Sequence, residues 1–475
     1  MLDLRIRDAL ILDGGDRPGV RGDVGVRDGR IVAVGRVDAA AARTAEAAGL
    51  ALAPGFIDVH THDDLEVIRN PAMPAKLSQG VTTVVVGNCG ISASPVVPGR
   101  AVPDPMNLLG PDGEFAYPRF SDYRAAVEAA RPWVNVAALV GHTALRHNHM
   151  DRLDRPATEA EIAAMRAQLR ESLDAGALGL SSGLAYASAF HAPNREVLAL
   201  SEELDGRRHA YASHLRDEFA RIVPALEEAL AVGHHSGAPV RVSHLKCAGV
   251  DNWGRSAEVL AALAHGAHGH DVACDCYPYA ASASTLDLKQ VTDAYDILVT
   301  WSQPHPAQGG RLLADIAADW GTDLLEAARR LQPAGAVYHC MDEADVRRIL
   351  AHPLTMIGSD GLPRDPRPHP RLWGTFPRVL GRYAREAGLF PLHTAVHKMT
   401  GLPAARFGLR DRGAVREGAH ADMVLFDPAT VRDAADYDDP VRPAVGIHAV
   451  WVNGRLAYDG AATAGEGHGR FLAPH

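Results

Sequence analysis

Short apolar runs alternate with amphipathic helical patterns through the middle of the chain. Runs such as 56–60 and 81–88 are bounded by turn residues, which is typical of buried strands. Between the runs, apolar residues recur at helical spacing, as in 157–175, where Thr158 is expected as the N-cap, and in 218–233. Strands that alternate with helices form βα units, so the pattern predicts an α/β fold built on a parallel sheet.

Eight strands can be placed in this region. They are 56–60, 81–88, 134–141, 177–182, 210–214, 239–244, 271–276 and 354–359. Eight parallel strands with intervening helices predict a (β/α)8 TIM-like barrel, whose functional residues gather at the C-terminal ends of the strands.

The two ends of the chain follow a different pattern. Residues 1–53 and 412–475 contain short alternating strands separated by turns, and we expect both segments to form one small β-sandwich domain beside a barrel of residues 54–411. The stretch 279–335 is too long for a single connection within the barrel, so we expect an insertion there that could act as a lid.

Composition narrows the function classes. The 475-residue chain has a net charge of −10 and no run of basic residues, so we expect no binding to nucleic acid. No apolar stretch is long enough to span a bilayer, and Met1–Ile6 alternates like a strand rather than a signal peptide, so we predict no membrane association and a cytoplasmic location. The five cysteines are scattered and odd in number, which favours reduced thiols over a disulfide framework.

Two histidines follow the first predicted barrel strand. On an extended strand, residues i and i+2 point to the same face, so His60 and His62 would present two imidazoles side by side. Two neutral imidazole nitrogens can hold one metal ion. The alternative is a half-buried strand that happens to carry two histidines.

Four more reactive side chains follow other predicted strands. Cys89 follows the second, His214 ends the fifth, His244 ends the sixth and Asp360 follows the eighth. Taken singly, each has an ordinary structural explanation, such as a buried thiol or a turn aspartate. Because the C-terminal ends of barrel strands meet on one face, their joint placement predicts a shared metal site.

Three further residues near strand ends carry weaker signals. His142 follows the third strand and is a candidate for the substrate pocket. Cys274 and Cys276 alternate on the seventh strand but lack a second cysteine pair, so we expect them to line the barrel rather than to bind zinc.

Several of these motifs resemble a known family. Residues 54–62 (PGFIDVHTH) resemble the strand-one signature of the amidohydrolase superfamily. Residues 78–92, 355–363 and 368–380 are more specific and resemble the D-aminoacylases, which are N-acyl-D-amino-acid deacylases. The resemblance runs over essentially the whole chain, and it implies a barrel, a small β domain built from both termini and an inserted segment.

The resemblance also implies a metal site. It implies a tightly held zinc on Cys89, His214 and His244, and a second, weaker site at His60 and His62 that could share Cys89. In the wider superfamily a lysine on strand four often bridges two metals, whereas strand four here ends Leu180–Gly183 without a lysine. D-aminoacylases use the strand-two cysteine instead.

Substrate contacts follow from the same resemblance. Three residues match those that hold the substrate α-carboxylate: Lys246, Tyr277 and Arg371. Three match residues that line the pocket: Tyr186, Ser284 and Met341. Asp360 is expected as the catalytic base that takes a proton from water and returns it to the departing amine.

The resemblance, together with these residues, implies zinc-dependent hydrolysis of N-acyl-D-amino acids to a carboxylate and a free D-amino acid. Segment 286–297 departs from the family pattern and carries Asp287, Asp293 and Asp296 against Lys289, so we expect neutral, apolar substrate side chains unless these aspartates face solvent. The alternatives are an N-acyl-D-glutamate or N-acyl-D-aspartate deacylase, a cyclic-amide hydrolase and a non-catalytic metal scaffold. We expect a small-molecule substrate and a monomer or small homo-oligomer.

Overall fold

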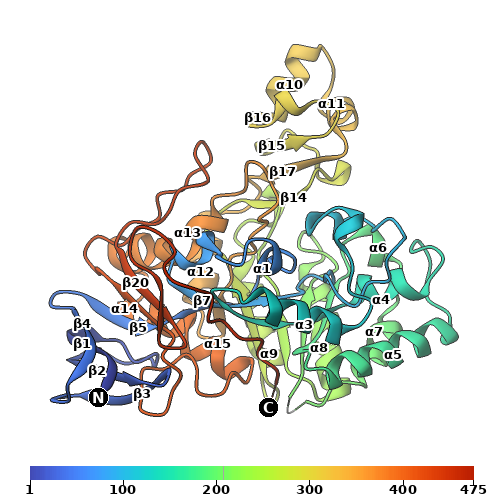
Figure 1. Ribbon diagram of the computed structural model, residues 1–475. Helices are drawn as coiled ribbons and strands as arrows, with labels where there is room; N and C mark the ends of the chain where they lie inside the picture. Colours follow the sequence, from blue (N-terminus) through green and yellow to red (C-terminus); the bar gives the residue numbers. More distant parts are fainter. Residues whose placement is uncertain (207, 475) are drawn as a thin grey trace.

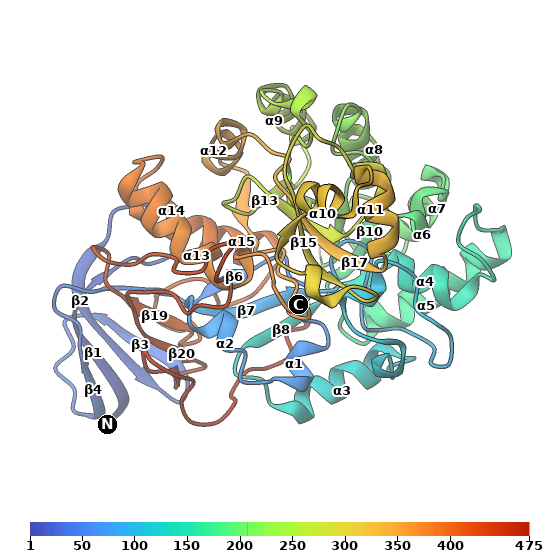
Figure 2. The same cartoon turned by 90° about the horizontal axis from the view of Figure 1, so that it is seen from above.

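Eight parallel strands form the centre of the molecule in the computed structural model, which describes residues 1–206 and 208–474. In chain order they are β6 (Phe56–Asp58), β7 (Val81–Val86), β8 (Asn135–Ala138), β10 (Gly179–Gly183), β11 (Ala210–His214), β12 (Val240–Val242), β13 (Val272–Cys276) and β18 (Thr355–Ile357). Seven helices follow the strands around the outside, as Figure 2 shows from above: α3 (Phe120–Ala130), α5 (Glu159–Asp174), α7 (Asn194–Ser201), α8 (Ile222–Ser236), α9 (Ser256–Gly266), α12 (Glu343–Ala351) and α14 (Leu392–Met399). The predicted (β/α)8 barrel is confirmed.

The barrel closes through a few specific contacts. Strands β6, β7 and β8 pair in parallel, and β10 to β13 and β18 form a second parallel series that begins with the short strand β9 (Val140–Gly141). The backbone N–H of Leu178 donates to the carbonyl of Ala138 at 2.7 Å and joins the two series on one side. A parallel bridge between Thr61 and Gly361 joins them on the other. The C-terminal ends of β6 and β18 are therefore neighbours.

Shorter helices fill the loops and the last part of the barrel. They are α1 (Glu66–Arg69), α2 (Pro74–Leu77), α4 (His142–His149), α6 (Ala187–Phe190), α13 (Arg371–Arg378), which continues into the π-helix η6 (Val379–Glu386), and α15 (Gly401–Arg406). The 3-10 turns are η1 (Met106–Leu108), η2 (Asp112–Glu114), η3 (Val250–Asn252), η4 (Leu288–Gln290) and η5 (Pro306–Gln308). Helix α5 begins as predicted, because Thr158 and Glu161 form a capping box at its N-terminus.

Both ends of the chain contribute to one eight-stranded sheet beside the barrel. Its order is β21-β20-β19-β5-β1-β2-β3, with β4 also paired to β1. The strands are β1 (Leu2–Ile11), β2 (Val20–Arg27), β3 (Arg30–Gly35), β4 (Ala41–Glu46), β5 (Ala51–Pro54), β19 (Met423–Phe426), β20 (Ile447–Val452) and β21 (Arg455–Tyr458). The antiparallel pairing of β5 with β19 is the seam between the two ends of the chain. It supports our proposed domain boundaries near residues 53 and 412.

The segment between β13 and β18 forms a sheet of its own, with the order β14-β17-β15-β16. Its elements are β14 (Ser282–Thr285), β15 (Ile297–Ser302), β16 (Arg311–Leu312), α10 (Leu313–Trp320), α11 (Leu324–Leu331) and β17 (Ala334–Tyr338). The segment projects from the barrel at the top of Figure 1. Strand β17 extends a few residues past the predicted end of the insertion at 335, and we still propose the segment as an insertion within the barrel domain of residues 54–411.

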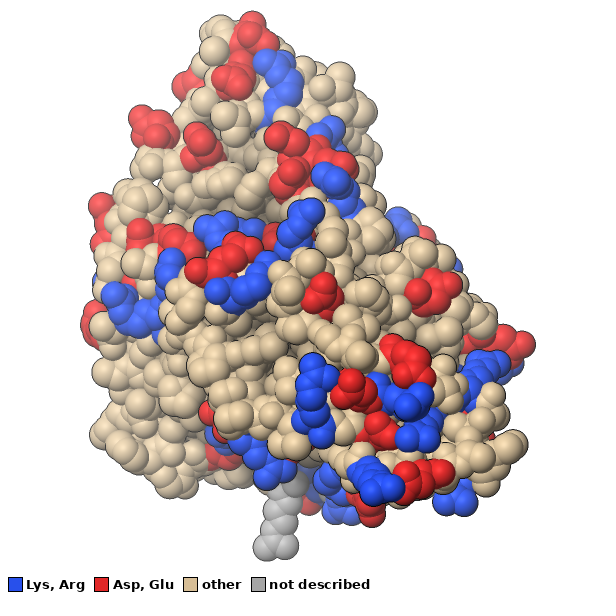
Figure 3. Space-filling view, turned by 90° about the vertical axis from the view of Figure 1, so that its left-hand side faces the viewer, with Lys and Arg blue, Asp and Glu red and all other residues tan. Residues whose placement is uncertain are grey.

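The outer surface carries mixed charge. On the face drawn in Figure 3, basic and acidic side chains are interspersed, so this face presents no basic stripe of the kind that binds nucleic acid. Within the described ranges, every helix is too short or too polar to cross a bilayer.

Candidate metal centre and active-site cavity

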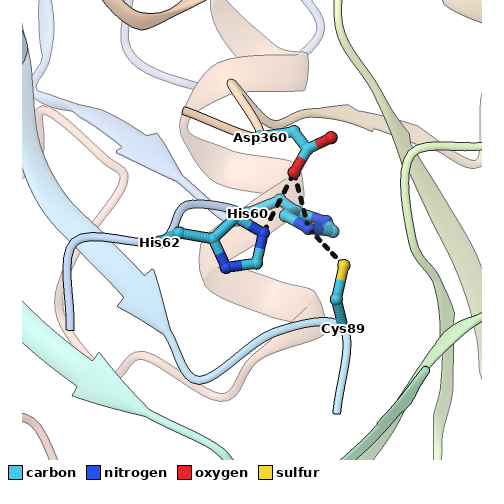
Figure 4. Close-up of side chains that lie close together, drawn as sticks. All are labelled: His60, His62, Cys89 and Asp360. Atoms are coloured by element: carbon cyan, nitrogen blue, oxygen red, sulfur yellow. Dashed lines mark hydrogen bonds and ion pairs between the residues drawn. The ribbon is translucent and has the colours of Figure 1, made fainter. Parts of the chain in front are cut away.

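Four buried side chains converge where β6, β7 and β18 end (Figure 4). His62 Nε2 donates to Asp360 Oδ1 at 3.1 Å, and His60 Nε2 lies 3.4 Å from the same oxygen. His60 Nε2 is also 3.1 Å from Cys89 Sγ. All four side chains have a ligand atom within 4.8 Å of one another. The structure thus brings two imidazoles, a thiol and a carboxylate to one point.

The two histidines meet for a different reason from the one expected. Strand β6 ends at Asp58, so His60 and His62 lie on the loop beyond it and not on the strand itself. Asp58 Oδ1 accepts the N–H of His60 at 3.3 Å and the N–H of Ser359 at 2.8 Å. The Asp58 side chain therefore replaces the next pair of strand hydrogen bonds and fixes the first and last strand ends against each other.

Two of the converging residues, and His244 of a second group described below, have an unusual backbone conformation. Cys89, His244 and Asp360 have φ values of +55°, +33° and +49°, a region that few residues other than glycine adopt. Each lies just past the end of its strand, and the turn aims its side chain inward. Such conformations cost energy and persist where the surroundings enforce them, often at functional sites. Gly358 allows the chain after β18 to approach His60 closely, since a Cβ on this residue would lie 2.6 Å from His60 Cβ.

A buried lysine stabilises the loop that carries His60 and His62. Lys76 Nζ donates to Asp58 Oδ2 at 2.7 Å and to Ser359 Oγ at 3.0 Å, and it lies 3.2 Å from Asp63 Oδ2. Lys76 and Asp58 are fully buried, so the ion pair is shielded from water. Sequence reasoning missed both residues; the signal was an aspartate inside an otherwise apolar strand.

A second group shares Cys89. Its ligand atoms come from Cys89, His214 and His244 and lie within 4.8 Å of one another. His244 Nε2 is 3.3 Å from Cys89 Sγ, and the rings of His214 and His244 meet edge to face with centroids 4.4 Å apart. Burial alone would raise the pKa of the Cys89 thiol, but the neighbouring charges of His60 and His244 hold it well below its usual value. Cys89 is therefore poised to act as a thiolate.

Two carboxylates contact the ring nitrogens of His60 and His244 that face away from Cys89. Both carboxylates were missed from the sequence. Asp275 Oδ2 lies 3.3 Å from His60 Nδ1, and Asp275 Oδ1 accepts the N–H of His244 at 3.0 Å. Glu218 Oε1 lies 3.0 Å from His244 Nδ1. A charged residue between two cysteines on a buried strand was the available signal for Asp275, whereas Glu218 lies on a loop and gave none.

The thiolate and imidazole donors suit zinc. Sulfur and neutral imidazole nitrogen are the ligands that zinc prefers, and a site with three protein ligands leaves a position for water. The carboxylates behind His60 and His244 fix the ring orientations that such a site requires. The donors present in both overlapping groups therefore fit this metal.

A cationic anchor lies beside Asp360. Arg371 Nη1 is 2.9 Å from Asp360 Oδ2, and the guanidinium lies over the ring of Tyr277, 4.6 Å from its centroid. His369 Nδ1 accepts the N–H of Arg371 at 2.9 Å, which fixes the start of helix α13. Burial alone would raise the pKa of Asp360, but Arg371 and His60 hold it well below its usual range. Asp360 is an anion that can accept a proton.

The site opens into a cavity of about 910 Å³. One side of its wall is formed by His62, His214, His244 and Asp360, and the other by the insertion, including β14. Four of the predicted substrate residues line it: Lys246, Tyr277, Tyr186 and Ser284. Arg371 reaches the site through Asp360, whereas Met341 is buried and does not form part of the wall.

His142 does not face this cavity. Its Nε2 pairs with Glu196 Oε1 at 2.9 Å, and Arg146 binds the same carboxylate oxygen. Cys274 and Cys276 lie on β13, but the expectation that they line the barrel is wrong: Asp275 between them points inward to His60, so the two cysteines face the surrounding helices. His142 is therefore part of a buried structural network and not of the pocket.

A family model described as the amidohydrolase family matches residues 43–458. The chain belongs to the amidohydrolase family. An N-acyl-D-aspartate deacylase of Alcaligenes xylosoxydans xylosoxydans is 50% identical over 474 residues, which cover 99% of this chain and 95% of that protein.

Two solved amidohydrolases are similar along their whole length. A D-aminoacylase is 48% identical, with a TM-score of 0.97 and complete coverage of both chains, and a binuclear metal centre has been described in D-aminoacylase. The N-acyl-D-glutamate deacylase of Bordetella bronchiseptica, solved with zinc and a phosphonate inhibitor, is 47% identical, with a TM-score of 0.95 and 99% coverage of both chains.

Proposed function

We propose that this amidohydrolase cleaves the amide bond of N-acyl-D-amino acids and releases a carboxylate and a free D-amino acid. The observation that carries the proposal is the position of Asp360, whose carboxylate contacts the His60 and His62 imidazoles on one side and Arg371 on the other. A proton acceptor, a set of metal ligands and an anion anchor thus share one cavity. Relatives that are 47–50% identical act on N-acyl-D-aspartate, on N-acyl-D-glutamate or as a D-aminoacylase.

We infer that Cys89, His214 and His244 would hold a tight zinc, and that His60 and His62 would hold a weaker second ion that could share Cys89. Bound zinc supplies a water of lowered pKa and polarises an amide carbonyl.

Asp360 would serve as the catalytic base. Its ionised carboxylate would take a proton from the attacking water and return it to the departing amine. The Oδ1 atom faces the two histidines, whereas Oδ2 is held by Arg371, so the carboxylate is fixed in direction.

Arg371, Lys246 and Tyr277 would hold the substrate α-carboxylate. Arg371 Nη1 pairs with Asp360, but among the described residues its Nε has no hydrogen-bond acceptor and the Tyr277 hydroxyl has no hydrogen-bond partner. Buried donors without acceptors are costly, so a substrate carboxylate would satisfy them. Fixing the carboxylate at one point and the acyl carbonyl at another leaves one direction for the side chain, which would select the D-isomer.

We keep neutral, apolar side chains as the proposed preference. Of the three aspartates in segment 286–297, Asp287 lines the cavity, together with Asp104 on a neighbouring loop. Burial, followed by the charge of Asp287, raises the pKa of Asp104. Lys289 also lines this wall, so the two acids face one cation there and an acidic substrate side chain would meet net negative charge.

The competing functions differ in assay outcome. The end of β10 carries Ser181, Ser182 and Gly183, where cyclic-amide hydrolases would need a bridging lysine. The deciding experiment measures zinc content and kcat/KM for the N-acetyl derivatives of D-Leu, D-Glu, D-Asp and L-Leu, with dihydrouracil as the cyclic amide. Preference for D-Leu supports the proposal, preference for D-Glu or D-Asp supports an acidic specificity, and turnover of L-Leu at an equal rate refutes the assignment.

All five cysteines are free and buried, which suits a reducing compartment and thus the cytoplasmic location we infer. We propose a monomer or small homo-oligomer.

A further inference from the structure

Glu218 connects parts of the site that the proposed mechanism treats separately. It is the fourth residue after His214, on the loop that leads into helix α8. Its Oε1 accepts a hydrogen bond from Lys246 Nζ at 2.5 Å and lies 3.0 Å from His244 Nδ1, while its Oε2 lies 3.8 Å from His214 Nε2. The side chain is 12% exposed and faces the cavity.

We propose that Glu218 is a positioning residue that holds the imidazole of His244 for metal binding and Lys246 for the substrate carboxylate. The part that concerns Lys246 rests on the function proposed above. Glu218 would contact neither the metal nor the substrate, and it would couple the metal site to the anchor by binding a member of each.

The first step concerns the proton on His244. Its Nε2 faces Cys89 Sγ at 3.3 Å, so this nitrogen must be free of a proton to bind a metal there. The ring proton must then lie on Nδ1 and needs an acceptor. Lys246 Nζ is closer, at 2.7 Å, but an ammonium only donates. Glu218 Oε1 is the acceptor that makes this tautomer favourable.

The same arrangement occurs on the other side of Cys89. His60 also faces Cys89 through Nε2, at 3.1 Å, and has a carboxylate oxygen of Asp275 at 3.3 Å from its Nδ1. Each of these two imidazoles thus has sulfur on one nitrogen and carboxylate on the other. If Glu218 were absent, Lys246 would donate to His244 Nδ1 and place the ring proton on the nitrogen that faces Cys89.

The second step concerns charge. Lys246 is buried and lies against a histidine that would bind a cation, so its positive charge opposes metal binding. Glu218 compensates that charge with one hydrogen bond. Because an ammonium has three N–H donors, Lys246 keeps donors for a substrate carboxylate.

The test compares zinc affinity between matched variants. In Glu218→Gln the shape is kept, but the charge and one acceptor are lost. The control is Glu227→Gln, the same change at an exposed position of helix α8. Zinc affinity is measured on metal-free protein by competition with a chromogenic chelator. We expect Glu218→Gln to bind zinc about 10- to 100-fold more weakly than the control.

Two more variants separate the two parts of the proposal. Glu218→Asp keeps the negative charge and should recover part of the zinc affinity. Lys246→Met should raise KM for N-acetyl-D-Leu at saturating zinc while leaving zinc affinity no weaker than that of the wild type, because the charge that opposes the metal is removed.

The outcomes are distinct. Zinc affinity of Glu218→Gln equal to that of Glu227→Gln overturns the proposal. If circular dichroism shows that Glu218→Gln is unfolded, Glu218→Asp and Glu218→Ala are compared instead. Wild-type zinc affinity in both variants overturns the charge and tautomer roles. A loss of zinc affinity in Glu218→Ala supports them. If wild-type protein hydrolyses no N-acyl-D-amino acid, the proposed function fails, but the zinc comparison still tests Glu218.

Discussion

Replacing Asp360 by asparagine removes the proposed base with little change of shape. Asp360 has a φ of +49°, and asparagine tolerates this conformation about as well as aspartate does, so the turn after β18 should persist. Alanine would add backbone strain and confuse the result. The Asp360→Asn change therefore isolates the carboxylate and its charge.

The effect on turnover follows from the missing proton transfer. An amide cannot accept the water proton at neutral pH, and a positioned acid-base group typically contributes about 10²- to 10⁴-fold. At 1.36 kcal/mol per tenfold change, this raises the activation barrier by about 2.7–5.4 kcal/mol. Zinc affinity should change far less, because the thiolate and imidazoles of Cys89, His214 and His244 remain.

The effect on stability comes from Arg371. Its side chain is 1% exposed and loses the carboxylate 2.9 Å from Nη1, and breaking a buried ion pair costs about 3–5 kcal/mol. Arg371 keeps a hydrogen bond to the Ala283 carbonyl at 3.1 Å and the Tyr277 ring, which favours the low end. Since domains are stable by about 5–15 kcal/mol, the variant should remain folded at 25 °C.

The assay measures kcat for N-acetyl-D-Leu, zinc content and the urea midpoint of unfolding. Asp365→Asn, five residues along the chain, is the control, because Asp365 hydrogen-bonds to Thr300 and does not line the cavity. If zinc-loaded, folded Asp360→Asn protein turns over within tenfold of the control, another residue is the base.

Three further predictions concern other residues. Cys89→Ala should lose zinc and activity together because it removes an anionic ligand. Cys247→Ala, at another buried thiol, is the control and should keep both. A full zinc content in Cys89→Ala protein would contradict the ligand set. Asp287→Asn should raise kcat/KM for N-acetyl-D-Glu relative to N-acetyl-D-Leu. Asp293→Asn, outside the cavity wall, should leave this ratio unchanged. Equal ratios in both variants would refute repulsion between Asp287 and an acidic substrate side chain. Burial alone would raise the pKa of Glu196, but its buried histidine and arginine partners lower it from 4.5 to about 2, so the carboxylate stabilises the fold above pH 4.5 and loses this effect as pH falls toward 2. Glu196→Gln should therefore cost about 3 kcal/mol at pH 7 and reduce the pH dependence of stability over that range, and an unchanged urea midpoint would show that the ion pair contributes nothing.

The barrel could be predicted from the sequence because local patterns carry the information. Apolar runs bounded by turns mark strands, and the capping box at Thr158 marks the start of helix α5. The predicted strands were longer than those observed, since β6 ends at Asp58 and β12 at Val242. In both places the chain leaves the sheet before the candidate ligands His60 and His244, and the pattern of apolar residues does not register that turn.

The sequence by itself determined which side chains stand at the ends of the strands, because the order of residues places a histidine, cysteine or aspartate after several of the apolar runs. Tertiary structure alone decided which atoms meet. The contacts of Asp275 and Glu218 with histidines on other strands depend on the register in which the barrel closes. The separation of Asp287 from Asp293 depends on how the insertion folds over the cavity. Local patterns encode burial and hydrogen-bonding capacity, whereas distances between residues far apart in the chain are fixed only when the strands pair and the ring of strands is complete.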